Sequence, residues 1–167
     1  MPFVVETQTL EPEAGGDIAL PRPHLASLFR GRGQYGIDDK GRLTLPQQMR
    51  RPLVDGGNLV VLDGRAVIWT EETYQQAVDH LQATVDHTDV LQQHVRGFVS
   101  STHPVSLDSQ GRIVIPPAVR VEADLENQVL VLGSGPRIEL LPAGTEDLDA
   151  MFGVHDSIVD ALDRANF

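Results

Sequence analysis

The feature that most constrains the fold of this chain is a short sequence motif that occurs twice. Residues 36–46 read GIDDKGRLTLP, and residues 106–116 read SLDSQGRIVIP. The matching residues keep a constant offset of seventy positions, and the same offset also relates Arg50 to Arg120 and Ile68 to Ile138. An internal repeat of this kind predicts two copies of one supersecondary unit that share a core.

Each copy predicts the same order of elements. The first copy reads as a strand at 32–37, a turn at 38–41, a strand at 43–45, a helical turn that starts at Pro46 and stops at Pro52, and a hairpin at 58–69. Alternating apolar residues indicate the strands, and the Asp-Gly pair at 63–64 is typical of a tight hairpin turn. The second copy repeats this order, with strands at 105–107 and 113–115, a helical turn from Pro116, and a hairpin at 128–141.

The remaining segments complete the predicted organisation. Residues 71–99 space their apolar side chains as a helix does, with a break predicted near 86–89, and the end of the chain predicts one or two short amphipathic helices. Residues 1–27 are rich in proline and lack periodicity. We therefore expect a flexible extension (1–27), a first repeat (32–79), a helical linker (80–100), a second repeat (101–144) and an acidic tail (145–167).

Charge is unevenly distributed along the chain. The net charge is −11, and the two ends are acidic, whereas residues 30–51 carry six basic and two acidic side chains, a net charge of +4. A basic cluster inside an acidic protein indicates a local anionic partner. The chain has no cysteine, which excludes disulfides and thiolate metal sites. The N-terminal segment resembles neither a signal peptide nor a membrane span, so a cytoplasmic protein is expected.

Patterns typical of enzymes and metal sites fit poorly. His80, His87 and His94 recur every seven residues, which on a helix separates neighbours by about 10 Å, too far to share one metal ion. The GSGP segment at 133–136 lacks the surroundings of a nucleophile elbow. The chain contains no glycine-rich phosphate loop and no dinucleotide fingerprint. We expect no enzyme activity, no metal, no cofactor and no small-molecule substrate.

The arginine that follows each turn is the strongest functional candidate. An aspartate could simply pair with this arginine across the turn, which would make the motif structural. Two copies at the same offset favour a binding role, because a solvent-facing position after the glycine could take most polar residues. The planar guanidinium can bind the O6 and N7 atoms of guanine with two hydrogen bonds in the major groove. Arg42 and Arg112 are therefore predicted to read DNA.

The segment LFRGRGQYGIDDKGRLTLPQQMRR, residues 28–51, resembles the opening of the MraZ family of bacterial transcriptional regulators. In that family a Phe-x-Gly start leads to the motif Asp-x-x-Gly-Arg-Leu-x-x-Pro. The helical linker of this chain and its second copy of the motif resemble the second half of MraZ proteins. The likeness therefore covers about residues 28–142. The resemblance implies an α+β fold with a mainly β core, in which two SpoVT/AbrB-type units form a pseudo-twofold swapped-hairpin β-barrel. It also implies ring-shaped oligomers that bind short repeated DNA motifs, usually as repressors of division and cell-wall genes.

The resemblance also implies roles for single residues. It makes Arg42 and Arg112 the DNA-contacting arginines, and we expect four other basic residues to contact phosphates: Lys40, Arg50, Arg51 and Arg120. The turns are expected to depend on Asp38, Gly41, Asp108 and Gly111. The expected partners are double-stranded DNA and further copies of the chain, at the nucleoid. The rival hypothesis is an AbrB-like antitoxin or a protein-binding scaffold, which the acidic tail and the helical linker favour.

Overall fold

The structure is a computed structural model that describes residues 28–84, 89–145, 162 and 164. The predicted extension at 1–27, the linker break and most of the predicted acidic tail with its short helices lie outside the described residues. The elements of the first half are β1 (Arg32–Gly36), β2 (Arg42–Thr44), α2 (Gln47–Arg50), the 3-10 helix η1 (Arg51–Leu53), β3 (Gly57–Leu62) and β4 (Arg65–Thr70). The helices α3 (Glu71–Thr84) and α4 (Asp89–Ser100) follow, and then β5 (His103–Val105), β6 (Arg112–Val114), α5 (Pro117–Glu122), β7 (Gln128–Gly133) and β8 (Arg137–Pro142).

The element order agrees with the predicted repeat, with two local corrections. The prediction that Pro52 ends the helical turn was wrong, because Pro52 lies at the start of η1, where its missing N–H needs no partner. Strand β5 begins two residues earlier than predicted, because residues 103–105 pair with Gly57–Leu59 of β3. The hairpin between β3 and β4 has the predicted turn, in which Asp63 and Gly64 both adopt positive φ values of 50° and 73°.

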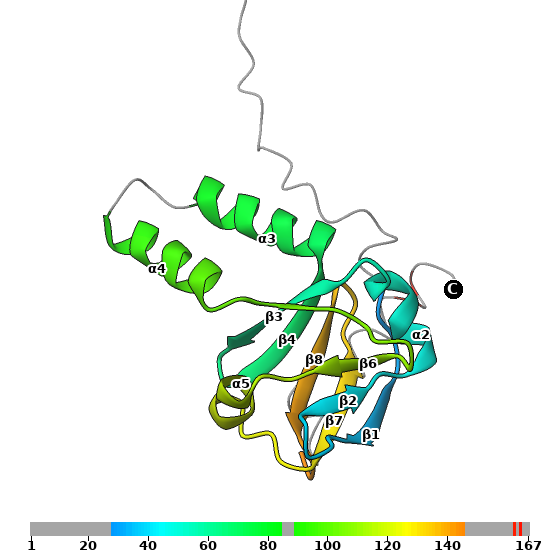
Figure 1. Cartoon of the computed structure of the whole chain (residues 1–167). Helices are drawn as coiled ribbons and strands as arrows, with labels where there is room; N and C mark the ends of the chain where they lie inside the picture. The colour runs from blue at the N-terminus through cyan, green and yellow to red at the C-terminus, as the bar shows by residue number, and fades with distance from the viewer. Residues whose placement is uncertain (1–27, 85–88, 146–161, 163, 165–167) are drawn as a thin grey trace, which may run out of the picture.

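The two halves exchange strands within one antiparallel sheet. The order of the six strands is β1-β7-β8-β4-β3-β5 (Figure 1). Strand β1 of the first half pairs with β7 of the second, and β5 of the second half pairs with β3 of the first. The two hairpins meet in the middle of the sheet, where β4 pairs with β8. Neither half therefore forms a complete sheet without the other.

The predicted closed barrel is wrong. A barrel requires that every edge strand pair with a neighbour, whereas in the described residues β1 and β5 are the two edges of an open sheet. Strands β2 and β6 pair with each other as a separate two-stranded ribbon. The ribbon covers the sheet with side chains, and its backbone pairing at the β1 edge is limited, among the described residues, to the isolated bridge between Ile37 and Leu43. The coarser prediction, a mixed fold built mostly on a sheet, is confirmed.

The strand registers reveal a pseudo-twofold axis. Ile68 of β4 lies opposite Ile138 of β8, and Leu43 of β2 lies opposite Ile113 of β6. Each pair joins two residues that are seventy positions apart, so each copy meets its own equivalent at both places. All four side chains are at most 1% exposed and belong to one core cluster. The axis therefore runs through the core, from the centre of the sheet to the centre of the ribbon.

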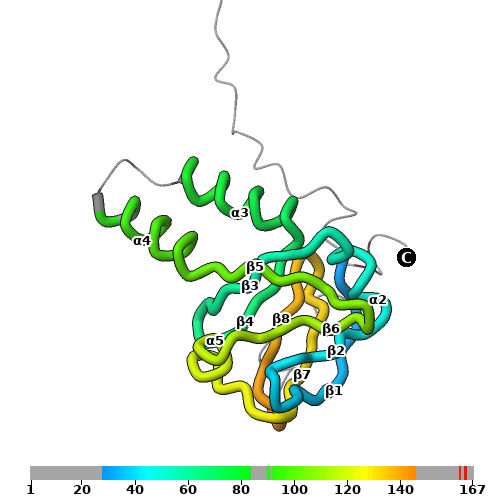
Figure 2. Tube along the Cα trace, in the orientation of Figure 1, coloured from blue at the N-terminus to red at the C-terminus, as the bar shows by residue number. Residues whose placement is uncertain are grey.

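A second, smaller cluster anchors the helical hairpin to the sheet. Helices α3 and α4 lie side by side and project beyond the sheet in both views (Figures 1 and 2). The ring of Phe98 on α4 packs against Trp69 of β4 and Tyr74 of α3, with centroid distances of 6.0 and 5.8 Å. The hydroxyl groups of Tyr74 and Thr102 are hydrogen-bonded at 3.0 Å. None of the described helices is long and apolar enough to cross a bilayer.

Candidate nucleic-acid interface

Asp38 organises the first turn. Its Oδ1 accepts hydrogen bonds from the backbone N–H groups of Lys40 and Arg42, each at 2.9 Å, and its Oδ2 accepts one from Arg42 Nε at 2.6 Å. The N–H of Gly41 donates to the Asp38 carbonyl at 2.9 Å, which closes the turn. Gly41 has a φ of 76°, in the left-handed region that favours glycine. The carboxylate thus holds the backbone of the turn and the arginine that follows it.

The second turn has the same geometry. Asp108 Oδ1 accepts from the N–H groups of Gln110 and Arg112 at 2.9 Å, and Oδ2 accepts from Arg112 Nε at 2.7 Å. The aspartate–arginine pairing that would make the motif structural therefore forms in both repeats. It uses one edge of each guanidinium only, because within the described residues the side-chain hydrogen bonds of Arg42 and Arg112 run through Nε. The structural role thus leaves the Nη groups available for a ligand.

The two turns are also joined to each other. The N–H of Leu45 donates to the carbonyl of Gly111 at 3.0 Å, and the N–H of Ile115 donates to the carbonyl of Gly41 at 2.8 Å. A Cβ atom added to Gly41 would lie 2.9 Å from the Ile115 carbonyl oxygen, so glycine is needed there for space as well as for its φ angle. Each turn is therefore tied by a backbone hydrogen bond to the end of the ribbon strand of the other repeat.

The ribbon presents both arginines on its outer face. Leu43 and Ile113 point into the core, so Arg42 and Arg112 at the neighbouring positions point away from it. Arg42 lies opposite Val114 and Arg112 opposite Thr44, so the two arginines are diagonal neighbours, a relation that separates residues on paired strands by about 7–8 Å. In Figure 2 the strands β2 and β6 cross the front of the sheet. A two-stranded β-ribbon has dimensions that the major groove admits.

Arg50 has a partner inside the protein. Its Nε donates to the carbonyl of Leu45 at 2.7 Å, and its side chain lies so close to Gly111 that a Cβ there would collide with the guanidinium. Arg50 therefore spans from the helix of the first repeat to the turn of the second. This contact stabilises the junction between the repeats, a role that the sequence analysis did not predict.

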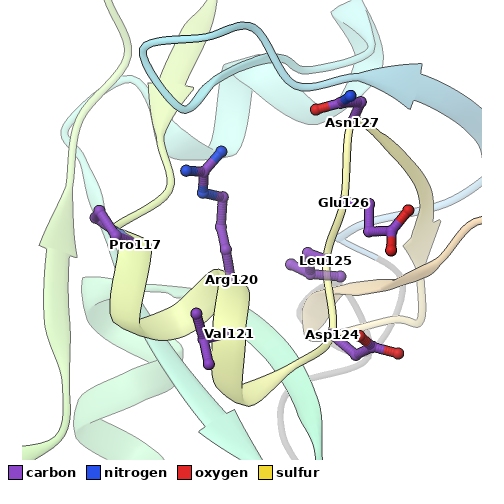
Figure 3. A pocket seen from close by; sticks show the side chains of 7 residues that line it. All are labelled: Pro117, Arg120, Val121, Asp124, Leu125, Glu126 and Asn127. Atoms are coloured by element: carbon purple, nitrogen blue, oxygen red, sulfur yellow. The ribbon is translucent and has the colours of Figure 1, made fainter.

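Arg120, the repeat equivalent of Arg50, has a different environment. It lines a pocket of about 520 Å³ and points from α5 toward the loop between β1 and β2 (Figure 3). The other lining residues are Pro117, Val121, Asp124, Leu125, Glu126 and Asn127. The Nε of Arg120 is buried and has no hydrogen-bond partner among the described residues. The internal contact made by Arg50 is therefore not reproduced in the second repeat.

The structure brings together part of the predicted set. Lys40 is exposed at the tip of the first turn, and Arg51 is exposed at the start of η1. Two further residues lie on the outer face of the ribbon and were not singled out by the sequence analysis, Thr44 and Val114. Strict alternation with the buried positions 43, 45, 113 and 115 could have identified them, because neighbours on a strand point to opposite faces.

The two turns predict how stability depends on pH. The backbone N–H of Arg42 holds the pKa of Asp38 below its usual value and the Arg42 side chain lowers it further, and Arg112 does the same for Asp108. A lowered folded-state pKa means that the ionised carboxylates stabilise the fold above the usual carboxyl range, and that this contribution is lost as the pH falls through the folded-state pKa. In urea titrations, the unfolding midpoint should therefore stay level from about pH 7 to 5 and fall in stronger acid.

The matched variant is the double substitution Asp38→Asn and Asp108→Asn. It should unfold at lower urea concentration than the wild type at neutral pH, and the two midpoints should converge in acid, where the wild-type carboxyls are also neutral. A difference in midpoint that stays constant down to pH 3 would show that ionisation of the two carboxyl groups does not stabilise the turns.

Comparisons with known proteins agree with the repeat. The family model described as "MraZ protein, putative antitoxin-like" matches residues 28–93 and 98–145. The chain is 34% identical over 116 residues to the "Transcriptional regulator MraZ" of Kineococcus radiotolerans, covering 68% of this chain and 80% of that protein. It is 31% identical over 121 residues to the protein of the same name from Clavibacter michiganensis, covering 72% of this chain and 85% of the relative.

Proposed function

The chain belongs to the MraZ family, and from this we propose that it is a transcriptional regulator that binds DNA in a sequence-specific manner through the outer face of the β2–β6 ribbon. One observation carries the proposal. Arg42 and Arg112 are related by the pseudo-twofold axis, and each is held at Nε by the aspartate of its turn, while within the described residues neither arginine uses an Nη group in a side-chain hydrogen bond. Two guanidinium groups held in fixed orientations on a narrow ribbon suit the major groove of a duplex.

The aspartates act as positioning residues in this proposal. Each carboxylate restricts the arginine to one orientation and neutralises part of its charge, so the arginine loses little conformational freedom when it meets a base. The two Nη groups can then donate to O6 and N7 of one guanine. The carboxylate oxygens are occupied by N–H donors of their own turn, which reduces their repulsion of the nearby phosphates.

Phosphate contacts are assigned to the more exposed basic residues. Lys40 precedes β2 in the chain, Arg51 follows it, and both are exposed. Phosphate contacts supply affinity and register without reading sequence. Arg50 first holds the junction between the repeats, and only its Nη groups remain for a phosphate. Arg120 is the equivalent of Arg50 in the second repeat and its Nε is buried, so in this proposal only its Nη groups serve as a phosphate contact of the second half.

We also propose a mode of assembly and a regulatory role. One ribbon carries two arginines, which is few for tight binding, so we propose a ring-shaped homo-oligomer that gains affinity through effective concentration on short repeated motifs. Strand exchange between the halves supports the swapped-hairpin description and the two-repeat division at 32–79 and 101–144. We propose that the protein acts at the nucleoid by binding and not by catalysis, as a repressor of division and cell-wall genes.

The test is selective binding. The full-length chain should bind a duplex taken from upstream of its own gene at least about a thousandfold more tightly than a scrambled duplex of the same composition. Affinity for both should fall as salt rises, because both depend on phosphate contacts. Equal affinity for the two duplexes would contradict the proposal, provided that duplexes selected from a random pool also show no enrichment.

A protein-binding role is the alternative, and the exposure of apolar side chains on the helical hairpin favours it. Val90 and Val99 on α4 are 61% and 44% exposed, on the hairpin that projects from the sheet. An antitoxin-like protein would retain a stoichiometric protein partner through purification at high salt and would show no preference among duplexes. Those two results together would replace the DNA-binding proposal.

A further inference from the structure

The outer face of the ribbon is not symmetric, although its arginines are. Thr44 and Val114 are seventy residues apart and therefore occupy equivalent positions in the two repeats. Val114 lies opposite Arg42, and Thr44 lies opposite Arg112. The pseudo-twofold axis thus relates an Arg–Val pair to an Arg–Thr pair. The ribbon therefore presents an apolar group beside Arg42 and a hydroxyl group beside Arg112.

Val114 is unusually exposed for an aliphatic side chain in a strand of this protein. It is 55% exposed, whereas Ile113 and Ile115 on either side are at most 1% exposed. Within the described residues it belongs to neither of the two hydrophobic clusters. Its methyl groups therefore lie on the face of the ribbon that contacts DNA in the proposed complex. Any apolar contact to them would have to come from the DNA.

The major groove offers one apolar group at a base edge, the 5-methyl group of thymine. Opposite residues on an antiparallel pair have Cβ atoms about 4.5–5.5 Å apart. A base held by Arg42 therefore places Val114 about one base step along the duplex, since successive bases on a strand are about 3.4 Å apart. Thr44 beside Arg112 carries a hydroxyl that can bond to several base edges, so the same preference is weaker on that side.

We propose that Val114 is a specificity-determining residue that selects a thymine methyl group next to the guanine bound by Arg42, and that the Thr44–Val114 difference fixes the direction in which the ribbon reads the duplex. This inference rests on the proposed function and adds a base preference to it. Removal of one buried methyl group costs an amount equivalent to about a fourfold loss of affinity. The effect is small for one ribbon, and it multiplies when several ribbons engage repeated motifs.

The test uses duplexes that the full-length chain enriches from a random pool. Each thymine of the enriched site is replaced in turn by deoxyuridine, which removes the methyl group and leaves the pairing edge unchanged. The wild-type chain should lose about fourfold in affinity at one thymine for each engaged ribbon and be unaffected at the others. Val114→Ser should bind the thymine and deoxyuridine duplexes equally, whereas Thr44→Ser, the matched change at the equivalent position, should keep the fourfold difference.

The outcomes separate this inference from the proposed function. If no duplex is enriched, both are overturned. If a site is enriched but no thymine methyl group matters, or if Val114→Ser keeps the same methyl dependence as the wild type, the inference alone is overturned. Both side chains are exposed, so the two variants should unfold at the wild-type urea concentration, and that measurement is made on the same samples.

Discussion

Replacement of both Arg42 and Arg112 by alanine is expected to abolish sequence-selective DNA binding. Each arginine supplies one two-point base contact in the proposed complex, and the loss of such a contact costs about 1–3 kcal/mol. Together the two losses correspond to a reduction of at least about thirtyfold for a single ribbon, and of more when several ribbons engage. Equilibrium titration of the enriched duplex and of a scrambled duplex measures the effect as the ratio of the two affinities.

Two control variants separate base reading from charge. Arg42→Lys keeps the charge and loses the planar fork, so it should keep most of the affinity for scrambled DNA and lose selectivity. Arg96→Ala removes one positive charge from an exposed position on α4 and should leave the selectivity ratio unchanged. If Arg42→Ala and Arg112→Ala lower affinity for both duplexes by equal factors, the arginines contact phosphates and do not read bases.

The two arginines are not expected to contribute equally. Residues 30–51 carry a net charge of +4, whereas residues 103–120 carry +1 with histidine neutral. A turn within the more basic half meets the duplex with more supporting phosphate contacts, so Arg42→Ala should weaken binding more than Arg112→Ala. Equal losses would show that the two halves engage the duplex alike.

Truncation of the ribbon's inner face is expected to cause the largest loss of stability. Leu43 and Ile113 are at most 1% exposed and face each other on the pseudo-twofold axis. Replacing either by alanine should lower the free energy of unfolding by about 2–5 kcal/mol, because a cavity forms where the ribbon packs on the sheet. The double variant should lose less than the sum of the two, because both substitutions open the same space.

Urea titration at several protein concentrations measures these losses and separates them from any effect of assembly. The matched control is Val114→Ala, which changes the adjacent, exposed position and should alter stability by less than about 0.5 kcal/mol. A loss below about 1 kcal/mol for Ile113→Ala would contradict the packing of the ribbon against the sheet.

Much of the local structure follows from the sequence, because it depends on short-range chemistry. Asp38 and Gly41 form the predicted turn since an aspartate can accept N–H bonds two and four residues ahead and glycine tolerates a positive φ. The Asp63–Gly64 pair gives the predicted hairpin because both residue types tolerate the positive φ values that this turn requires. The internal repeat also predicts that the second turn copies the first, and the hydrogen bonds of Asp108 do so.

Long-range pairing could not be predicted in the same way. Nothing within β1 distinguishes β7 of the other half from a strand of its own half as a partner, and the short strands β2 and β6 could have joined the sheet or formed a ribbon. The difference between Arg50 and Arg120 is also invisible in the sequence, since both follow a Pro-initiated helical turn at the same offset. These features depend on how the two repeats pack against each other.

The central claim is that the outer face of the β2–β6 ribbon touches DNA, and site-specific cross-linking tests it most directly. The chain has no cysteine, so Thr44→Cys creates a single attachment point on the ribbon for a short photoreactive group, and Gln75→Cys creates one on the exposed face of α3. With the full-length chain and the enriched duplex, irradiation should join DNA to the residue 44 variant and not to the residue 75 variant. Cross-links from residue 75 alone, with none from residue 44 while the duplex is bound, would contradict the account.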